Sequence, residues 1–387
     1  MMAILPSVWH LMNMKQRGVQ FPSLSSLAVS TTLDNYYNFA FHTNSTTLCD
    51  LTHPLALSIL LVLVLMLRTS KEILLPKLSL IGRNIGRATH GDEWEINNSD
   101  RIVKFGEYLN RLFYHTVMSI YGLWYFHDKS WCDTDQGGTK NLWIDYPNHP
   151  VEPGMAWYYL VQSAYNVDAL ISLMKSSFII EIMNPFAYSS AMDVAEKEHL
   201  VRKEESSQSC QHRIVLWTPL FQIEWNETVR GDFREMFVHH LVTNTLIFLS
   251  SHYRFTRVGS MVFMLHDLSD VLGDMSKLAH FMKLEVTTII CFVIMVLLWL
   301  ITRLVIFPFV ICKSFWVDSY EYMVLMGTLD PSIHNTFYIL FSALLGTLIL
   351  LNMIWFLMFL RMGWKLIKTG ERHDYTEHKR GEKQKAT

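Results

Sequence analysis

The chain has 387 residues and a mass of 45.2 kDa; half of its residues are hydrophobic, 18% are charged, and the mean hydropathy is +0.18. Soluble domains carry about 25% charged residues, so this composition favours a polytopic membrane protein. The net charge of −2 gives no reason to expect nucleic-acid binding, and five cysteines are too few for a disulfide scaffold.

The N-terminal part of the chain contains one predicted span, followed by a basic segment. A transmembrane helix needs about 20 mostly apolar residues, because lipid offers the backbone no hydrogen-bond partners. Residues 55–67 are intensely apolar, but they reach that length only with help from residues 47–54. We therefore expect a lumenal segment over residues 1–53, a first transmembrane helix over 54–68 and a cytosolic connection over 69–104.

Six further spans are predicted within one domain over residues 105–365. They share spanning length and a mostly apolar composition, and they cover residues 108–126, 157–180, 233–250, 258–281, 286–308 and 336–362. A polar cytosolic insertion over 181–231 precedes the fourth span, a lumenal connection over 312–335 joins the last two, and residues 366–387 form a basic cytosolic tail. The prediction is an all-α integral membrane protein with about seven transmembrane helices.

The distribution of charge orients this topology. Most of the 33 Lys and Arg residues fall on one side, and cytosolic connections collect Lys and Arg, so the N-terminus is predicted to be lumenal and the C-terminus cytosolic. Asn44 then lies in a lumenal glycosylation sequon, whereas the sequons at Asn97 and Asn226 are cytosolic and should stay unmodified. The ending at residues 383–387 resembles a dilysine retrieval signal, so we expect a multi-pass protein of the endoplasmic reticulum membrane.

Two of the predicted spans, 233–250 and 258–281, carry unusual polar residues. On the first, four polar side chains share one face at about 100° per residue; they are His239, His240, Thr243 and Ser250. On the second, five ionisable side chains occupy a stripe about 100° wide, the width normally given to an apolar face; they are His266, Asp267, Asp270, Asp274 and Lys277. This stripe must face protein or water rather than lipid.

The free energy of burying these groups separates a structural role from a functional one. Each charged group at mid-membrane costs about 2.5–3.5 kcal/mol, whereas a polar pair in a membrane bundle contributes under about 2 kcal/mol. A satisfied polar network can explain any single residue, and it explains Asp274 and Lys277 as well as a site does. It explains the remaining histidines and aspartates poorly when they are taken together.

Buried histidines beside carboxylates suit acyl transfer. Desolvation keeps a buried imidazole neutral, so that it can act as a base or a nucleophile, and a carboxylate fixes its tautomer. One group can then take a proton from an attacking amine or carry the acyl group. The rival is a single metal held by two His and two Asp. A di-iron site needs more clustered histidines, and His115 stands alone, so we predict no metal.

The region resembles the ceramide synthases, a family built on the TLC domain. The residues that carry the resemblance are Arg230, Asp232-Phe233, Glu235-Met236-Phe237, His239-His240-Leu241, Thr243, Ser250, Arg257-Val258-Gly259, His266-Asp267, Ser269-Asp270 and Lys277. The wider resemblance covers about residues 100–365. The insertion 181–231 looks longer than the link usual in this family.

The resemblance implies a sphingosine or sphinganine N-acyltransferase that joins a fatty acyl group from acyl-CoA to a sphingoid base, inside a lipid tunnel enclosed by six helices. It implies that the catalytic residues are His239, His240, Asp267 and Asp270. Substrate binding falls on His266, Thr243, Ser250, Asp274, Lys277 and Arg257. Of these, Arg257 and Lys277 could instead face backbone carbonyls.

No tightly bound cofactor is expected, and acyl-CoA is the co-substrate. The expected partners are acyl-CoA, a sphingoid base and membrane lipids, and a homo- or hetero-oligomer is left open. Two other hypotheses stand beside the enzyme: a non-catalytic relative that binds or senses lipids, and a metal-dependent membrane lipid oxygenase.

Overall fold

The computed structural model describes residues 45–129, 131, 138–182, 214–217, 221–225, 232–325 and 331–369. These residues are mostly helical, and they divide into two compact units. The first unit is drawn from residues 1–166 and 242–359, and the second from 167–241 and 360–387. Asn44, the basic tail and most of the insertion 181–231 lie outside the described residues.

Helix α4 (Pro54–His90) begins at the predicted residue but is far longer than the predicted span. His53 caps it by accepting a hydrogen bond from the Leu55 backbone N–H at 3.2 Å, and Pro54 occupies the first turn. The helix ends at Gly91, whose φ of 92° is a conformation that favours glycine. The predicted connection over 69–104 is therefore helical: α4 is followed by α5 (Asp92–Asn97) and α6 (Ser99–Phe126).

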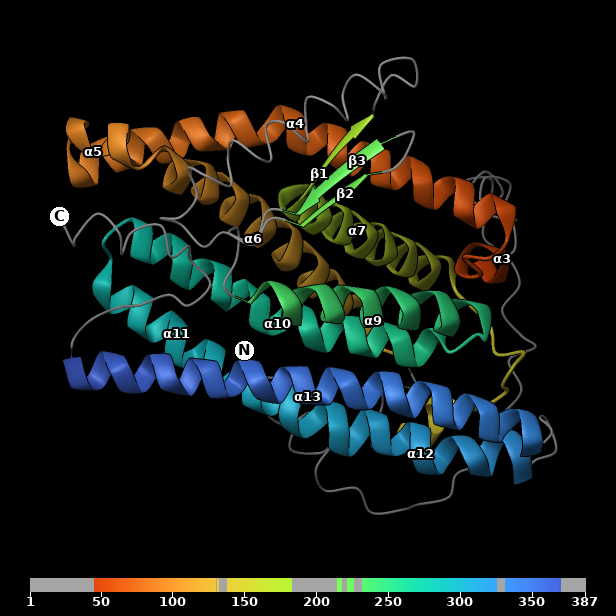
Figure 1. The fold of residues 1–387 in the computed structure, drawn as a ribbon. Helices are drawn as coiled ribbons and strands as arrows, with labels where there is room; N and C mark the ends of the chain where they lie inside the picture. Colours follow the sequence, from red (N-terminus) through yellow and green to blue (C-terminus); the bar gives the residue numbers. More distant parts are fainter. Residues whose placement is uncertain are drawn as a thin grey trace, which may run out of the picture. The chain divides into compact units, whose positions relative to one another are not determined.

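Close packing explains why α4 continues beyond its apolar half. Helices α4 and α6 lie side by side, with α5 at the turn between them (Figure 1). Small residues let the two backbones approach: a Cβ added at Gly106 would lie 2.8 Å from Ser79 Oγ, and one added at Gly82 would lie 2.7 Å from the Phe105 ring. A hydropathy window measures apolar length and does not register such contacts, so it ended the helix too early.

Helix α7 (Pro153–Ser177) ends three residues before the end of the predicted third span, and the chain then enters a small sheet. Strands β1 (Phe178–Ile182), β2 (Ile214–Trp217) and β3 (Phe221–Trp225) pair antiparallel in the order β1-β3-β2, with Ile223 opposite both Ile180 and Leu216 (Figure 1). The all-α expectation missed this sheet, most of which lies within the predicted insertion. Its strands are rich in β-branched and aromatic residues, which favour extended backbone.

Helices α9 (Phe233–His252) and α10 (Thr256–Phe281) coincide closely with the predicted fourth and fifth spans. The Phe255 N–H donates to the Ser250 carbonyl at 2.7 Å and closes the tight turn between them. Ser251 ties this turn to the segment after α3 (Ser45–Cys49): its Oγ accepts from the Leu51 N–H and donates to the Cys49 carbonyl, both at 2.6 Å. Residues Cys49 and Leu51 are thus fixed to the α9–α10 turn.

The last two predicted spans are parts of longer helical runs. Helix α11 (Glu285–Trp299), the π-helical η4 (Leu300–Cys312), α12 (Lys313–Tyr320) and η5 (Glu321–Leu325) are continuous. After them comes α13 (Pro331–Thr369). The predicted lumenal connection over 312–335 is therefore helical up to residue 325. Proline lacks the backbone N–H of a regular helix, and the π-helical turns around Pro308 accommodate that gap.

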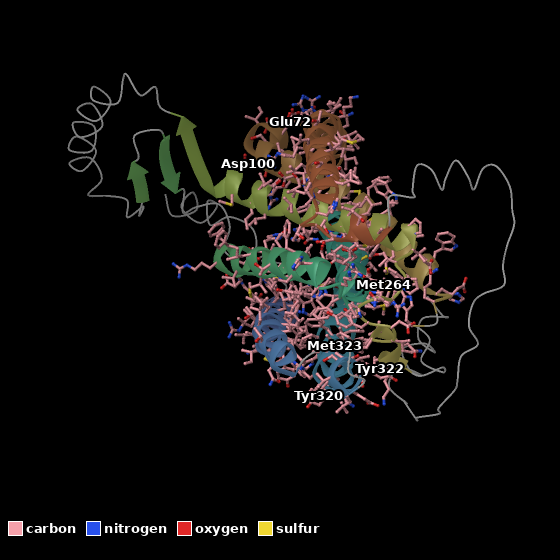
Figure 2. The ribbon with its side chains drawn as sticks, turned by 90° about the vertical axis from the view of Figure 1, so that its right-hand side faces the viewer. Glu72, Asp100, Met264, Tyr320, Tyr322 and Met323 are labelled. Carbon is pink, nitrogen blue, oxygen red and sulfur yellow. The ribbon has the colours of Figure 1, made fainter. Side chains whose placement is uncertain are left out.

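Two of these runs, Glu285–Leu325 and His334–Thr369, are long and apolar enough to cross a membrane. They contain the two most apolar predicted spans. The side chains of Tyr320, Tyr322 and Met323 lie together at the end of the first run (Figure 2). The total of seven transmembrane helices stays a prediction.

Candidate functional site

The ionisable stripe of α10 lies in contact with other helices of the first unit. Helix α10 packs against α6, α11 and η4. Met264 of α10, labelled in Figure 2, fits against Gly122 of α6, where an added Cβ would lie 3.3 Å from Met264 Cγ. Asp267 and Asp274 are only 6% and 5% exposed. The stripe therefore meets protein, as its insertion cost requires.

Asp267 is held on both of its carboxylate oxygens. Its Oδ1 lies 3.0 Å from Nδ1 of His115 on α6, and its Oδ2 accepts a hydrogen bond from the Gln162 amide on α7. Gln162 Nε2 in turn lies 3.3 Å from the Tyr158 hydroxyl. The expectation that His115 stands alone is wrong, because the fold brings α6 against α10.

Asp270 has a different partner, an arginine of η4. Its Oδ1 accepts from Arg303 Nη2 at 2.6 Å, and the same arginine donates to Ser269 Oγ at 3.0 Å and to the His266 carbonyl at 2.7 Å. The guanidinium lies 3.8 Å from the centre of the Trp299 ring. The Asp270 side chain is nevertheless 38% exposed, whereas that of Arg303 is 4% exposed. Asp270 thus pairs with Arg303 through one carboxylate oxygen, and its side chain is otherwise partly exposed.

Asp274 and Lys277 lie further along α10, beside the first half of α6. Arg111 Nη2 lies 2.5 Å from Asp274 Oδ1. The Arg111 guanidinium and the Lys277 ammonium each lie 5.1 Å from the centre of the Tyr108 ring. An ion pair with flanking cation–π contacts is a satisfied network, which is the structural explanation already open for Asp274.

His266 is fixed by its own helix. Its Nδ1 donates to the Val262 carbonyl at 2.8 Å, and its ring meets Phe307 edge-on at 5.3 Å between centroids. Because Nδ1 carries the proton, Nε2 is an acceptor, and it is buried without a hydrogen-bond partner among the described residues. This lone pair is available to a bound molecule.

The other predicted binding residues differ in how fully their polar atoms are used. Arg257 Nη1 donates to the carbonyls of Asn141, at 3.0 Å, and Ile144, at 3.3 Å, in and after the short helix η1 (Gly138–Leu142). Ser250 Oγ lies 2.5 Å from the Tyr159 hydroxyl. Thr243 Oγ1 is buried with no hydrogen-bond partner in the part of the chain that the structure describes.

The histidine pair belongs to the second unit. His239 and His240 are partly buried on α9, with ring centroids 5.5 Å apart and ring planes inclined at 67°. Consecutive side chains of a helix point about 100° apart, so the two imidazole rings project in different directions from α9. The aspartates belong to the first unit.

Four polar partners were not predicted as site residues: Arg111, His115, Gln162 and Arg303. One signal could have found the two arginines, because both lie inside predicted spans where a charge needs a partner. The surplus of aspartates on α10 offers that partner. No sequence pattern pairs His115 or Gln162 with Asp267, because those contacts depend on which helices are neighbours.

Metal binding was the rival explanation for this chemistry. Within the described ranges, no group of three or more His, Cys, Asp or Glu side chains is arranged to hold a metal ion. Asp267, Asp270 and Asp274 are instead contacted by donors of the protein.

These features define a helical transmembrane protein with charged side chains enclosed between its helices. The TLC domain matches residues 104–183 and 213–361, which is more than half of the chain, and the chain belongs to the TLC domain family. The match is interrupted between residues 183 and 213, within the predicted insertion.

Individual relatives carry ceramide synthase names. The chain is 24% identical to ceramide synthase hyl-2 of Caenorhabditis elegans over 288 residues, covering 73% of this chain and 70% of the relative. It is 26% identical to ceramide synthase 5 of Homo sapiens over 270 residues, covering 70% and 53%. ASC1-like protein 1 of Oryza sativa subsp. japonica is 37% identical over 154 residues, covering 39% and 48%. The chain thus spans about half the length of several curated relatives it matches.

Proposed function

We propose that this protein is a ceramide synthase, an acyltransferase that moves a fatty acyl group from acyl-CoA to the amine of a sphingoid base. Similarity to ceramide synthases of worm and human supports the reaction class. The observation that carries the site is the buried Asp267 carboxylate, which His115 and Gln162 contact on its two oxygens, beside the paired carboxylate of Asp270. On this proposal, the polar side chains of α10 take part in the acyl transfer.

The proposed reaction has two steps. An imidazole nitrogen of His239 attacks the thioester carbonyl carbon, the C–S bond breaks, and the CoA thiolate leaves and takes up a proton. The sphingoid amine then attacks the acyl-imidazole carbon, the bond from this carbon to the imidazole breaks, and the amide forms as the amine loses a proton to a base. His240 orients the first histidine or the incoming amine.

The two aspartates suit different parts of this scheme. Asp267 receives hydrogen bonds on both oxygens from residues that need carry no charge, so its negative charge remains to stabilise an imidazolium. Asp270 uses one oxygen for Arg303 and keeps a partly exposed carboxylate, so it is the better acceptor for the amine proton. Of the predicted binding residues, His266 and Thr243 retain buried polar atoms for a substrate.

The proposed location and orientation in the membrane follow from the sequence. We propose an endoplasmic reticulum location, a lumenal N-terminus and a cytosolic C-terminus, so that acyl-CoA approaches from the cytosolic side. Lys277, near the end of α10, and Arg111, in the first half of α6, then lie toward the cytosolic end. Six helices of the TLC domain enclose the lipid chain, and no resident cofactor is required.

The direct test supplies the purified protein with sphinganine and labelled acyl-CoA. The expected result is an N-acylated product, whose acyl chains are then profiled by mass spectrometry. A protein that binds lipid but forms no N-acylated product would instead support the hypothesis of a non-catalytic relative. Stoichiometric iron in the preparation would support the oxygenase.

Substitutions then test the residues. His239→Ala and Asp267→Ala should each lower turnover by more than about a thousandfold, because each removes a group needed in the transition state. The double variant should be no worse than either single variant if both act in one step. His252→Ala, an exposed histidine at the end of the same helix α9, is the matched control and should keep turnover. Near-wild-type turnover in both single variants would show that the site is misassigned.

A further inference from the structure

His115 occupies an enclosed position on α6, next to the candidate site. It is 8% exposed, and its imidazole contacts groups from two other helices. Nδ1 lies 3.0 Å from Asp267 Oδ1 of α10, and Nε2 lies 3.3 Å from the Tyr165 hydroxyl of α7. The rings of Tyr114 and Tyr165 both stand edge-on to it, at 5.4 Å between centroids. Contacts through both nitrogens fix the plane of the ring.

These contacts assign a hydrogen-bonding role to each nitrogen of the neutral imidazole. A tyrosine hydroxyl can donate to Nε2, and the carboxylate of Asp267 can only accept. In the neutral imidazole, Nδ1 therefore carries the hydrogen and donates it to Asp267, while Nε2 accepts from Tyr165. The Gln162 amide donates to the other oxygen of Asp267. Two donors on two helices thus define where the carboxylate points.

Asp267 differs from the other two carboxylates of α10 in one respect. Asp270 and Asp274 each have an arginine partner, Arg303 and Arg111. The hydrogen bonds that Asp267 receives come from His115 and Gln162, and neither has to be charged. An arginine cancels the charge of a carboxylate, whereas neutral donors orient it and leave the charge for a neighbour. The arrangement therefore preserves a negative charge at a fixed position.

We propose that His115 is a positioning residue for the acyl transfer, which acts by holding the Asp267 carboxylate in the orientation that the reaction uses. This inference rests on the proposed function. Tyr165 extends the arrangement by one step, since its hydroxyl fixes the tautomer of His115.

The test measures kcat and KM separately for three variants of the full chain in the N-acylation assay. His115→Phe removes the donor and keeps a ring, and kcat should fall about 10- to 100-fold, as expected for a hydrogen bond to a charged group. The KM values for sphinganine and acyl-CoA should stay within about twofold. His115→Asn restores a donor near Oδ1, and kcat should recover to within about fivefold of wild type. His149→Phe is the control for replacing an equally buried histidine elsewhere in the first unit, and it should leave both constants unchanged.

Several results would overturn the inference. They are a wild-type kcat in His115→Phe, an equal loss in the Phe and Asn variants, and a change confined to KM. If His115→Phe fails to fold, Tyr165→Phe removes only the hydroxyl, and kcat should fall about 2- to 10-fold; an unchanged kcat there would also contradict us. A wild-type protein that forms no N-acylated product would refute the proposed function itself, which separates the two failures.

Discussion

At the scale of single residues, Asp267 and Asp270 of the α10 stripe are equivalent in the sequence but not in the fold. They are three positions apart, and one turn of helix points both toward the same side. His115 of α6 and Gln162 of α7 hold Asp267, whereas Arg303 of η4 holds Asp270. The difference in partners leaves Asp267 without an arginine and Asp270 with a partly exposed side chain. A reaction that needs both an orienting group and a proton acceptor can use this difference.

His149, between η1 and α7, provides a residue-scale test of pH dependence. It is 3% exposed, stacks on Tyr146, and has no hydrogen-bond partner on either ring nitrogen among the described residues. Burial and the positive charges of Arg257 and Arg254 lower the pKa of His149 to about 4.

Because the folded state binds this proton more weakly than the unfolded state, its stabilising contribution is complete above about pH 6.5 and is lost as the pH falls toward 4. Between about pH 7.5 and pH 5, the free energy of unfolding should fall by about 2 kcal/mol more in wild type than in His149→Phe. Thermal unfolding in detergent at the two pH values measures the difference. If the free energy of unfolding changes equally with pH in the two proteins, the lowered pKa of His149 would be contradicted.

At the scale of elements, close backbone contacts and a π-helical segment decide where helices continue. Arg303, which binds Asp270, lies within η4, and π-helical turns are frequent at functional sites. Helix α4 continues past its apolar half because glycines of the α4–α6 pair let the helices approach. Both features concern backbone geometry rather than hydropathy.

Gly106→Ala tests the α4–α6 contact. The added methyl group would lie 2.8 Å from Ser79 Oγ, 3.1 Å from the Ser79 backbone nitrogen and 3.3 Å from the Leu75 carbonyl oxygen. Because two of these atoms belong to the backbone, the helices must separate, which should cost about 1–3 kcal/mol of unfolding free energy. The melting temperature in detergent should fall.

Gly346→Ala, in the interior of α13, is the matched control. An added Cβ there meets no atom within 4 Å, so the higher helix propensity of alanine should leave the melting temperature equal or higher. A Gly106→Ala protein that melts with or above wild type would show that the contact is looser than described.

At the scale of the whole molecule, helix length and charge together define the topology to be tested. With 37 and 39 residues, α4 and α13 are about 55–60 Å long, so each exceeds the hydrocarbon thickness of about 30 Å. Each helix that spans the membrane therefore also reaches beyond it. The predicted orientation places the second half of α4 and the end of α13 on the cytosolic side.

Glycosylation tests this orientation in the intact protein. When the protein is expressed in a eukaryotic cell, treatment with a glycosidase should increase its gel mobility, and Asn44→Gln should abolish that change. Asn97→Gln and Asn226→Gln should leave it intact, because both sequons are predicted to be cytosolic. A glycan on Asn97 or Asn226 would show that this side of the protein is lumenal, which contradicts the predicted orientation. The result is independent of catalytic activity.

The amino-acid sequence by itself determined the membrane class, the most apolar helices, the bounds of α9 and α10 to within two residues, and the cluster of ionisable groups on α10. These are local properties, since hydropathy and helical periodicity depend only on neighbouring residues. The tertiary structure decided the continuation of α4 and of the α11–η5 run, the pairing of β1 with β3, and the partners of each aspartate. Those depend on contacts between residues far apart in the chain, such as His115 with Asp267 and Arg303 with Asp270, which become neighbours only when the helices pack.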